Sequence, residues 1–421
     1  MDKTPILIAE QLLKIVKRTY GADDVLSGSQ LSPSEVHDSK YQIEDLCGQL
    51  LRSVLGPLGY TVLLAESCQE SSALGFVTAL GVPDLLGDDK SMSAQEISDA
   101  LGVRSKYLKV AMSCLTKHGY FDEAKAHATD VVAYRNNELS SILKESHPST
   151  LKDAVGFICD EGFKATSHLL PASKTTSSGD KDTPAINLAF GFDQSVFEWM
   201  SREAWRGRRM GNAMQQLHRV ANGNVIFDYE WSKLTSPIVD IGGGIGSLEL
   251  ALAKNRPQDQ FQFVIFDIPE TTENAKKVWK EQVLPEHSSI TFQAGNFMAP
   301  AFEETSLPIG KPTYIIRHVL HDWSDEEVLH ILKHVRTAMS THPTDNPTTQ
   351  SKLILCEMLL HPDSHRFIRT TSMQLLSLNS GLTRTETEMI RLVEEAGFVV
   401  IRSHKMRAAD TIIEATVPST R

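Results

Sequence analysis

A histidine at position 321 stands where a strand pattern gives way to a helix pattern. The segment from Ile316 reads IRHVLHDWSDEEV, and its Ser324 followed by three acids has the composition of a helix start. An imidazole at such a junction has a pKa near neutrality and could take a proton from a hydroxyl group. A histidine that caps a helix or packs in the core would give the same local pattern, so the chemical interpretation needs a ligand site close by.

A glycine-rich turn from Asp240 to Gly246 is a candidate for that site. A short apolar strand leads into DIGGGIG, and an amphipathic helix follows. Glycine lacks the Cβ that would keep a ligand away from the backbone, and the first N–H groups of a helix favour negative charge. We expect the turn to hold a ligand carboxylate, or a ribose hydroxyl paired with Asp240. A purely structural turn is the alternative, and the spacing G-G-G-x-G disfavours NAD, whose sites read G-x-G-x-x-G.

Polar residues also end the candidate strands that follow. Asp267 closes the run FVIFD, a little beyond the offset of about 20 residues expected of an acid that binds a ribose. Asn296 follows ITFQAG and could read an adenine, and the run PTYIIR leads into the segment of His321. Ligands of open parallel sheets lie beyond the carboxyl ends of the strands. These residues should therefore surround one nucleoside ligand.

Short β-branched runs alternate with helical patterns in the C-terminal half, which predicts an α/β fold with a parallel, Rossmann-like sheet wrapped by helices. The N-terminal half is mainly helical. We predict a first domain over residues 1–165 and a second over 166–421. Two polar stretches, 171–184 and 340–351, have the composition of surface loops.

The N-terminal half contains a helix-turn-helix pattern. Ser93 and Glu96 form a predicted capping box, a break follows at Gly102, and a second periodic segment runs from Ser105 to about Gly119. A strand near Tyr120 would complete a winged helix. Such an arrangement can bind DNA, but few basic residues lie on its second helix, so we favour a packing or dimerisation module.

The amino-acid composition narrows the possible classes of function and the possible location of the protein. The net charge of −11 argues against a general affinity for nucleic acid, and the five cysteines are scattered without a C-x-x-C pair, so no disulfide framework or metal site is indicated. No apolar run approaches the length of a membrane span, and the N-terminus has charges where a signal peptide would be apolar. We therefore expect a soluble, cytoplasmic protein with no membrane partner.

With these motifs in place, the chain resembles the class I S-adenosylmethionine-dependent O-methyltransferases of the plant and fungal caffeate type. The resemblance covers most of the chain and includes DIGGGIGSLELAL, FDIPE, RHVLHDWSDEE, LILCEMLLHP and TRTETEMIRLVEEAGF. It implies a homodimer, a small hydroxylated substrate and the cofactor S-adenosylmethionine. By resemblance, His321 is the general base and Glu357 orients it. The residues expected near the cofactor are Asp240, Gly242, Gly244, Asp267, Asn296, Phe297 and Arg317.

Three departures from the family pattern bear on the chemistry. Thr383 and Ser372 stand where the family has acids, and Asn296 stands where it has an aspartate. Losing an acid beside His321 should lower the pKa of that histidine and weaken it as a base. Some fungal members of the family keep the cofactor but catalyse dehydration or pericyclic ring formation. Such a reaction is therefore a second hypothesis, in which His168 could donate a hydrogen bond to a substrate carbonyl. A binding protein without catalytic activity is a third.

Overall fold

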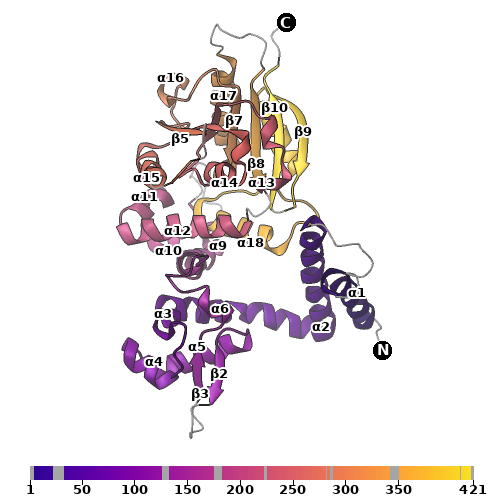
Figure 1. The fold of residues 1–421 in the computed structure, drawn as a ribbon, viewed down its shortest axis with the longest axis vertical. Helices are drawn as coiled ribbons and strands as arrows, with labels where there is room; N and C mark the ends of the chain where they lie inside the picture. Colours follow the sequence, from indigo (N-terminus) through magenta and orange to yellow (C-terminus); the bar gives the residue numbers. More distant parts are fainter. Residues whose placement is uncertain are drawn as a thin grey trace. The chain divides into compact units, whose positions relative to one another are not determined.

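A computed structural model describes residues 4–21, 33–125, 132–174, 183–221, 225–280, 282–284, 288–341, 350–407 and 409–418 of the chain. Contacts divide it into two units (Figure 1). The first comprises Met1–Phe163 and Met200–Leu217, and the second comprises Lys164–Trp199 and His218–Arg421. The sequence placed one boundary between residues 165 and 166, whereas the chain first leaves unit 1 after Phe163 and later returns to it. Most of the two predicted polar loops, residues 175–182 and 342–349, lies outside the described ranges.

Unit 1 is mainly helical, as the sequence predicted. Its elements are α1 (Thr4–Tyr20), α2 (Pro33–Ala79), α3 (Val82–Leu86), β1 (Met92–Ser93), α4 (Ala94–Leu101), α5 (Ser105–Lys117), β2 (Asp122–Lys125), β3 (Val132–Arg135), α6 (Glu138–Ser141), α7 (Lys152–Phe157), the π-helical turn η2 (Ile158–Gly162) and most of α12 (Ala204–Ala221). The long helix α2 is kinked at Gly56, whose backbone is not helical.

The predicted winged helix is present in unit 1. The Ser93 hydroxyl accepts a hydrogen bond from the Glu96 backbone N–H at 3.3 Å, and the Glu96 carboxylate accepts one from the Ser93 N–H at 2.7 Å, which completes the capping box. Gly102 ends α4 in the left-handed conformation. The three short strands pair in the order β1-β3-β2, and one apolar core joins α2, α4 and α5.

Unit 2 contains a seven-stranded sheet of order β6-β5-β4-β7-β8-β10-β9, in which β10 runs antiparallel to both of its neighbours. Its strands are β4 (Ile238–Ile241), β5 (Gln262–Asp267), β6 (Ser289–Ala294), β7 (Thr313–Arg317), β8 (Lys352–Met358), β9 (Val399–Lys405) and β10 (Asp410–Thr416). Strands β4 to β7 are the four runs that the sequence predicted as strands, β8 contains the start of the motif LILCEMLLHP, and all five strands are parallel. Their carboxyl ends therefore meet at one edge.

The helices of unit 2 are α8 (Phe163–Thr166), which begins at the last residue of unit 1, α9 (Leu169–Ala172), α10 (Ala185–Phe190), α11 (Val196–Ser201), α13 (Val225–Asp228), α14 (Ser247–Asn255), α15 (Pro269–Lys280), α16 (Phe302–Thr305), α17 (Asp325–Ser340), α18 (Arg366–Asn379) and α19 (Glu386–Glu395), with short 3-10 turns η3 (Trp231–Lys233), η4 (Pro257–Asp259) and η5 (Leu320–Asp322). Alternate residues of β4 enter two different apolar clusters: Val239 packs in the cluster of α17 and α19, and Ile238 in that of α13 and α14. Because side chains alternate along a strand, helices cover both faces of the sheet.

Within the described ranges, we find no helix long and apolar enough to cross a bilayer. The same residues include no cluster of three or more His, Cys, Asp or Glu side chains suited to a metal ion.

Candidate active site

The glycine-rich turn between β4 and α14 has the backbone conformation that its sequence predicts. Gly242, Gly244 and Gly246 all have positive φ, at 73°, 59° and 76°, which side chains rarely tolerate. A Cβ on Gly242 would lie 2.7 Å from a methyl group of Val319, whereas a Cβ on Gly244 would have no atom within 4 Å. The turn thus packs against the segment that follows β7 and leaves open space over Gly244.

Asp267, at the end of β5, lies beside this turn as predicted. One oxygen of its carboxylate accepts a hydrogen bond from the Gly244 N–H at 2.9 Å, and the other accepts one from the Ile268 N–H at 2.8 Å. Burial raises the pKa of Asp267, and the two backbone N–H groups partly offset that effect. The carboxylate therefore ties the end of β5 to the turn.

Asn296 and Phe297 follow β6, and their side chains differ in position. The Phe297 ring lies 3.5 Å from the site of a Cβ on Gly242 and meets the Trp323 ring edge-on at 5.9 Å between centroids. The Asn296 side-chain oxygen instead accepts a hydrogen bond from the Met298 N–H at 2.9 Å. Phe297 thus borders the turn directly, and Asn296 shapes the loop beside it.

Asp240 is not at the surface of the turn, and its predicted contact with a ribose stays a prediction. Only 3% of Asp240 is exposed, and Glu249 of α14, which is fully buried, is its neighbour. Burial first and then the charge of Glu249 raise the pKa of Asp240 well above its ordinary value. Two carboxyl groups share this buried space, and Arg317 lies near enough to favour their ionisation. The Asp240 side chain therefore lies beneath the turn, against Glu249.

His321, in η5, is held by Glu357 of β8. The His321 Nδ1 atom lies 2.8 Å from one Glu357 oxygen, and the other oxygen accepts hydrogen bonds from the N–H groups of Val319 and Leu320 at 2.9 and 2.8 Å. Glu357 is 1% exposed and His321 7%. The carboxylate therefore fixes both the imidazole and the backbone that carries it, which leaves Nε2 as the ring nitrogen for chemistry.

The pKa of His321 moves opposite to the expectation from the sequence. Burial opposes the charged ring, but Glu357 and then Asp322 more than offset it and raise the pKa to about 9. Asp322, which the sequence did not suggest, lies 3.7 Å from His321 Nε2 and accepts a hydrogen bond from Asn379 at 2.6 Å. A second carboxylate thus stands beside the imidazole although Thr383 is no acid.

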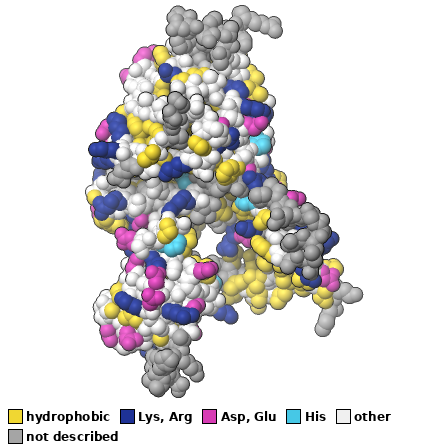
Figure 2. Space-filling model, in the orientation of Figure 1, with side chains coloured by type: hydrophobic (Ala, Val, Ile, Leu, Met, Phe, Trp, Pro, Cys, Tyr) yellow, Lys and Arg dark blue, Asp and Glu magenta, His cyan; other side chains and the backbone are white. Residues whose placement is uncertain are grey.

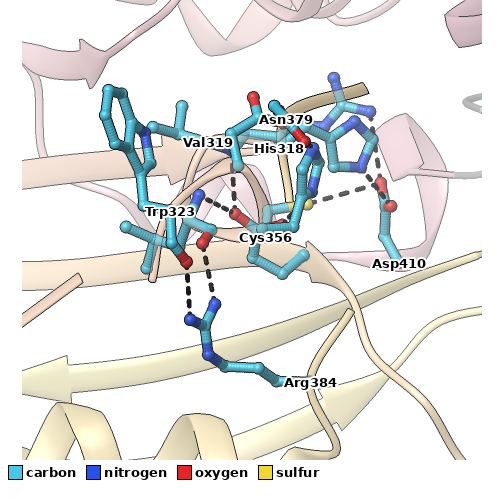
Figure 3. Close-up of polar contacts among 12 residues, drawn as sticks. His318, Val319, Trp323, Cys356, Asn379, Arg384 and Asp410 are labelled. Atoms are coloured by element: carbon cyan, nitrogen blue, oxygen red, sulfur yellow. Dashed lines mark hydrogen bonds and ion pairs between the residues drawn. The ribbon is translucent and has the colours of Figure 1, made fainter. Parts of the chain in front are cut away.

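Arg384 holds the loop that carries His321 (Figure 3). Its guanidinium donates hydrogen bonds to the Leu320 carbonyl at 2.9 Å, the Trp323 carbonyl at 2.7 Å and the Asp325 carboxylate at 2.8 Å. The side chain is 1% exposed. Such buried, charge-assisted bonds to two carbonyls of one loop make the loop rigid.

A second histidine with a carboxylate partner lies next to His321, and the sequence did not reveal it. Asp410, at the start of β10, has one oxygen 2.6 Å from His318 Nε2 and the other 3.2 Å from the Arg317 guanidinium (Figure 3). The rings of His318 and His321 are 5.8 Å apart between centroids. Arg317, predicted near a ligand, is only 8% exposed and pairs with this carboxylate. Asp410 lies far from both residues in sequence, so no local pattern could have indicated the pairing.

His168 lies in the turn between α8 and α9. Its Nδ1 is 3.1 Å from the Lys164 carbonyl and 3.0 Å from the Ser167 hydroxyl, and these are its hydrogen bonds in the described part of the chain. No contact brings it to His321 among those residues. Its proposed donation to a substrate stays a prediction.

Comparison with known proteins gives consistent matches. A model described as an O-methyltransferase domain matches residues 176–399, and one described as an O-methyltransferase dimerisation domain matches residues 62–146. O-methyltransferase tpcA of Aspergillus fumigatus is 25% identical over 93% of this chain and 90% of its own length. Mitomycin biosynthesis 6-O-methyltransferase of Streptomyces lavendulae is 28% identical over 81% of this chain and 88% of its own. The solved structure of the mitomycin 7-O-methyltransferase MmcR is 24% identical, covers 85% of this chain and 97% of its own, and has a TM-score of 0.69, which shows a shared fold.

Proposed function

Because the chain belongs to the O-methyltransferase family, we propose that it transfers the methyl group of S-adenosylmethionine to a hydroxyl group of a small secondary metabolite, with His321 as the general base. The observation that carries this proposal is the contact between the glycine turn and the segment of His321. Val319, two residues before the histidine, packs within 2.7 Å of where a Cβ on Gly242 would lie. This contact supports a proposed base that lies next to the proposed nucleoside site.

The residues of the turn fit the proposed cofactor. Gly242 and Gly244 present backbone without Cβ atoms, the space over Gly244 is open, and the Asp267 carboxylate beside it can accept hydrogen bonds from ribose hydroxyls. Phe297 offers an aromatic surface next to the turn. Asp240 and Arg317 would act from below, by holding the turn and the end of β7 in place. When bound, S-adenosylmethionine supplies an electrophilic methyl group.

His321 would remove the hydroxyl proton of the acceptor. The Glu357 carboxylate accepts the Nδ1–H of the imidazole, so the neutral ring has its lone pair on Nε2. As the hydroxyl oxygen gains its new bond, its proton passes to Nε2, and the charge that develops on the ring is stabilised by Glu357 and Asp322. Positioning of the two reactants contributes a further large part of the rate.

The test is replacement of His321 by Ala. Release of S-adenosylhomocysteine should fall about a thousandfold or more, within the range of general-base loss, whereas calorimetry should show unchanged binding of S-adenosylmethionine. His330→Ala is the matched control, because His330 lies on α17 and its ring bonds the Ala299 carbonyl. Full methyl transfer by the His321 variant contradicts the assignment.

A homodimer is part of the proposal. On the described surface of α2, a row of apolar side chains is exposed, at Leu51, Val54, Leu55, Leu58, Val62, Leu63 and Leu64. Figure 2 shows hydrophobic side chains gathered over this helix. Leu58 is 82% exposed, and a continuous apolar face of this kind favours coverage by another protein surface. The match to a dimerisation domain supports a second copy as that surface.

The pKa of His321 supports a second candidate reaction. A His321 pKa of about 9 means that the ring is largely protonated at neutral pH in the free protein, which suits a hydrogen-bond donor in a dehydration or pericyclic reaction. Mass spectrometry of cells with and without the gene separates the two functions. Methyl transfer adds about 14 mass units and dehydration removes about 18, whereas a pericyclic isomerisation changes neither mass nor cofactor.

A further inference from the structure

Helix α1 has apolar side chains on two faces, and only one of them is covered in the described part of the chain. The first face packs against α2, where the Arg18 guanidinium donates a hydrogen bond to the Ser39 hydroxyl at 3.2 Å (Figure 1). On the second face, Ile6, Leu13 and Tyr20 are each more than half exposed. No residue of α1 is buried. The second face is therefore open to another surface.

The exposed face of α1 has the residue spacing of a coiled coil. Its apolar residues recur at alternating steps of three and four, and we call this row the α1 seam: Ile6, Ala9, Leu13, Val16 and Tyr20. A row with this period runs along one side of a helix and packs against a second helix. The 17 residues of α1 make a helix about 26 Å long, and the seam spans nearly all of it. The spacing therefore predicts a helix as the partner of the seam.

The α1 seam lies outside the segments that the family models match. The dimerisation model begins at residue 62 and the O-methyltransferase model at residue 176, whereas α1 ends at Tyr20. The apolar row that we assign to the homodimer, from Leu51 to Leu64, belongs to a different helix, α2. The α1 seam is thus a second apolar surface of unit 1, and the homodimer contact on α2 does not account for it.

A second copy of α1 that runs in the opposite direction fits the seam. When Leu13 lies opposite Val16 of the second copy, Ala9 lies opposite Tyr20 of that copy, so the smallest seam residue faces the largest one. Such a contact is isologous, because each residue pair occurs twice about a twofold axis. The side-chain sizes along the seam therefore agree with antiparallel self-pairing.

Two exposed charges beside the seam favour the same orientation. Glu10 follows Ala9 and Lys17 follows Val16, so both charges flank the seam on the same side. In the antiparallel register these flanking positions face each other, and Glu10 of each copy meets Lys17 of the other. In a parallel pair, the same two charges would face uncharged residues of the second copy instead. The charges are therefore complementary only in the antiparallel arrangement.

We propose that α1 mediates a second contact between copies of this chain, in which two α1 helices pair antiparallel along the α1 seam. Together with the homodimer contact on α2, this pairing joins two dimers into a tetramer. The count of four rests on the homodimer of the proposed function, whereas the pairing of α1 does not depend on the reaction. Because one pair of short helices buries little area, the contact should be weak and should depend on protein concentration.

The experiment measures the molar mass of the full chain by light scattering over a dilution series. The unaltered protein should be a tetramer at on the order of 100 µM and a dimer at on the order of 1 µM. Glu10→Lys or Lys17→Glu places like charges opposite each other twice, so each should raise the midpoint concentration about tenfold. The double variant should restore the midpoint. Gln11→Lys and Lys14→Glu are the matched controls, because they make comparable charge changes at exposed positions off the seam.

Two results overturn the proposal. One is an unaltered protein that stays a dimer at the higher concentration. The other is a pair of single reversals that the double variant does not rescue, which is expected if the seam covers the α2 row of another copy or a different protein.

Two further variants separate the α1 contact from the homodimer contact. Leu13→Glu should remain a dimer at both concentrations, and Leu58→Glu should be a monomer at the lower one and a dimer, joined through α1, at the higher one. Rescue by the double variant also excludes misfolding as the cause of the single effects. Failure of the proposed methyl transfer is distinguishable, because the molar mass does not depend on S-adenosylhomocysteine release.

Discussion

Replacing Glu357 with Gln tests the acid–base design of the site most directly. The side chain keeps its shape, and its remaining oxygen can still accept the backbone N–H groups of Val319 and Leu320. The new amide nitrogen, however, faces His321 Nδ1 and donates to it. This favours the tautomer with its hydrogen on Nε2, the atom that must receive the substrate proton.

The magnitude follows from the pKa of His321. The difference between about 9 and the ordinary 6.5 corresponds to about 3 kcal/mol of extra stabilisation of the protonated ring. Glu357 is the largest favourable cause, so in the variant burial should dominate and the pKa should fall below 7. A tautomer error in a comparable catalytic histidine costs about four orders of magnitude in kcat, and we expect a loss of at least about a thousandfold.

The assay is an NMR titration of the His321 ring in both proteins, which needs no substrate. In the unaltered protein, kcat/KM for S-adenosylmethionine, which reports the cofactor-free enzyme, should also rise with pH until about 9, because only the deprotonated ring is a base. A raised pKa stabilises the folded state fully below pH 6.5, and this stabilisation is lost as the pH rises through 9. That slope should be absent from the variant. A His321 pKa near 6.5 in the unaltered protein, or one that the substitution does not move, refutes the reasoning.

Three further substitutions probe the turn, the loop and the dimer. Gly242→Ala should weaken binding of S-adenosylmethionine by about 100-fold in calorimetry, since its backbone is left-handed and its Cβ would clash, whereas Gly211→Ala, with open space, should not. Arg384→Met should lower the free energy of unfolding by about 3 kcal/mol, and Arg391→Met, an exposed partner of the same aspartate, by under about 1 kcal/mol, both read by denaturant titration. Leu58→Glu should convert a dimer into a monomer in light scattering while cofactor binding persists.

The sheet and the turn were predictable because their signals are local. Short, β-branched apolar runs between helical patterns favour strands, and the five runs here are parallel strands in the structure. The three left-handed glycines of the turn are equally a property of residue type and order. Glu357 was placed by family resemblance, and its contact with His321 then follows from the pairing of β7 with β8.

Side-chain burial and long-range pairing could not be read from the sequence in the same way. Asp240 ends an apolar strand, but only the fold shows that Glu249 from the next helix lies against it and that both are buried. His318 meets Asp410 and His218 across 92 and 100 residues. The sequence made no prediction for Asp322, whose carboxylate lies 3.7 Å from the His321 ring and is the second carboxylate that the family pattern lacked. Each miss is a contact that depends on tertiary packing.

The high pKa of His321 also bears on how the site could become active. In the free protein at pH 7.5, most of the rings would be protonated, and a protonated ring is no base. A cation bound next to it disfavours that charge, since like charges at short range in a buried site repel strongly. His321 should therefore release its proton when the positively charged S-adenosylmethionine binds, and retain it with S-adenosylhomocysteine, whose sulfur has no charge.

Calorimetry in two buffers of different ionisation enthalpy measures this difference in proton release. We expect release of up to one proton at pH 7.5 with the first ligand and almost none with the second, and a loss of the difference in His321→Ala. Equal proton release by both ligands would mean that the cofactor's charge does not reach the imidazole, and the base would then have to lie elsewhere.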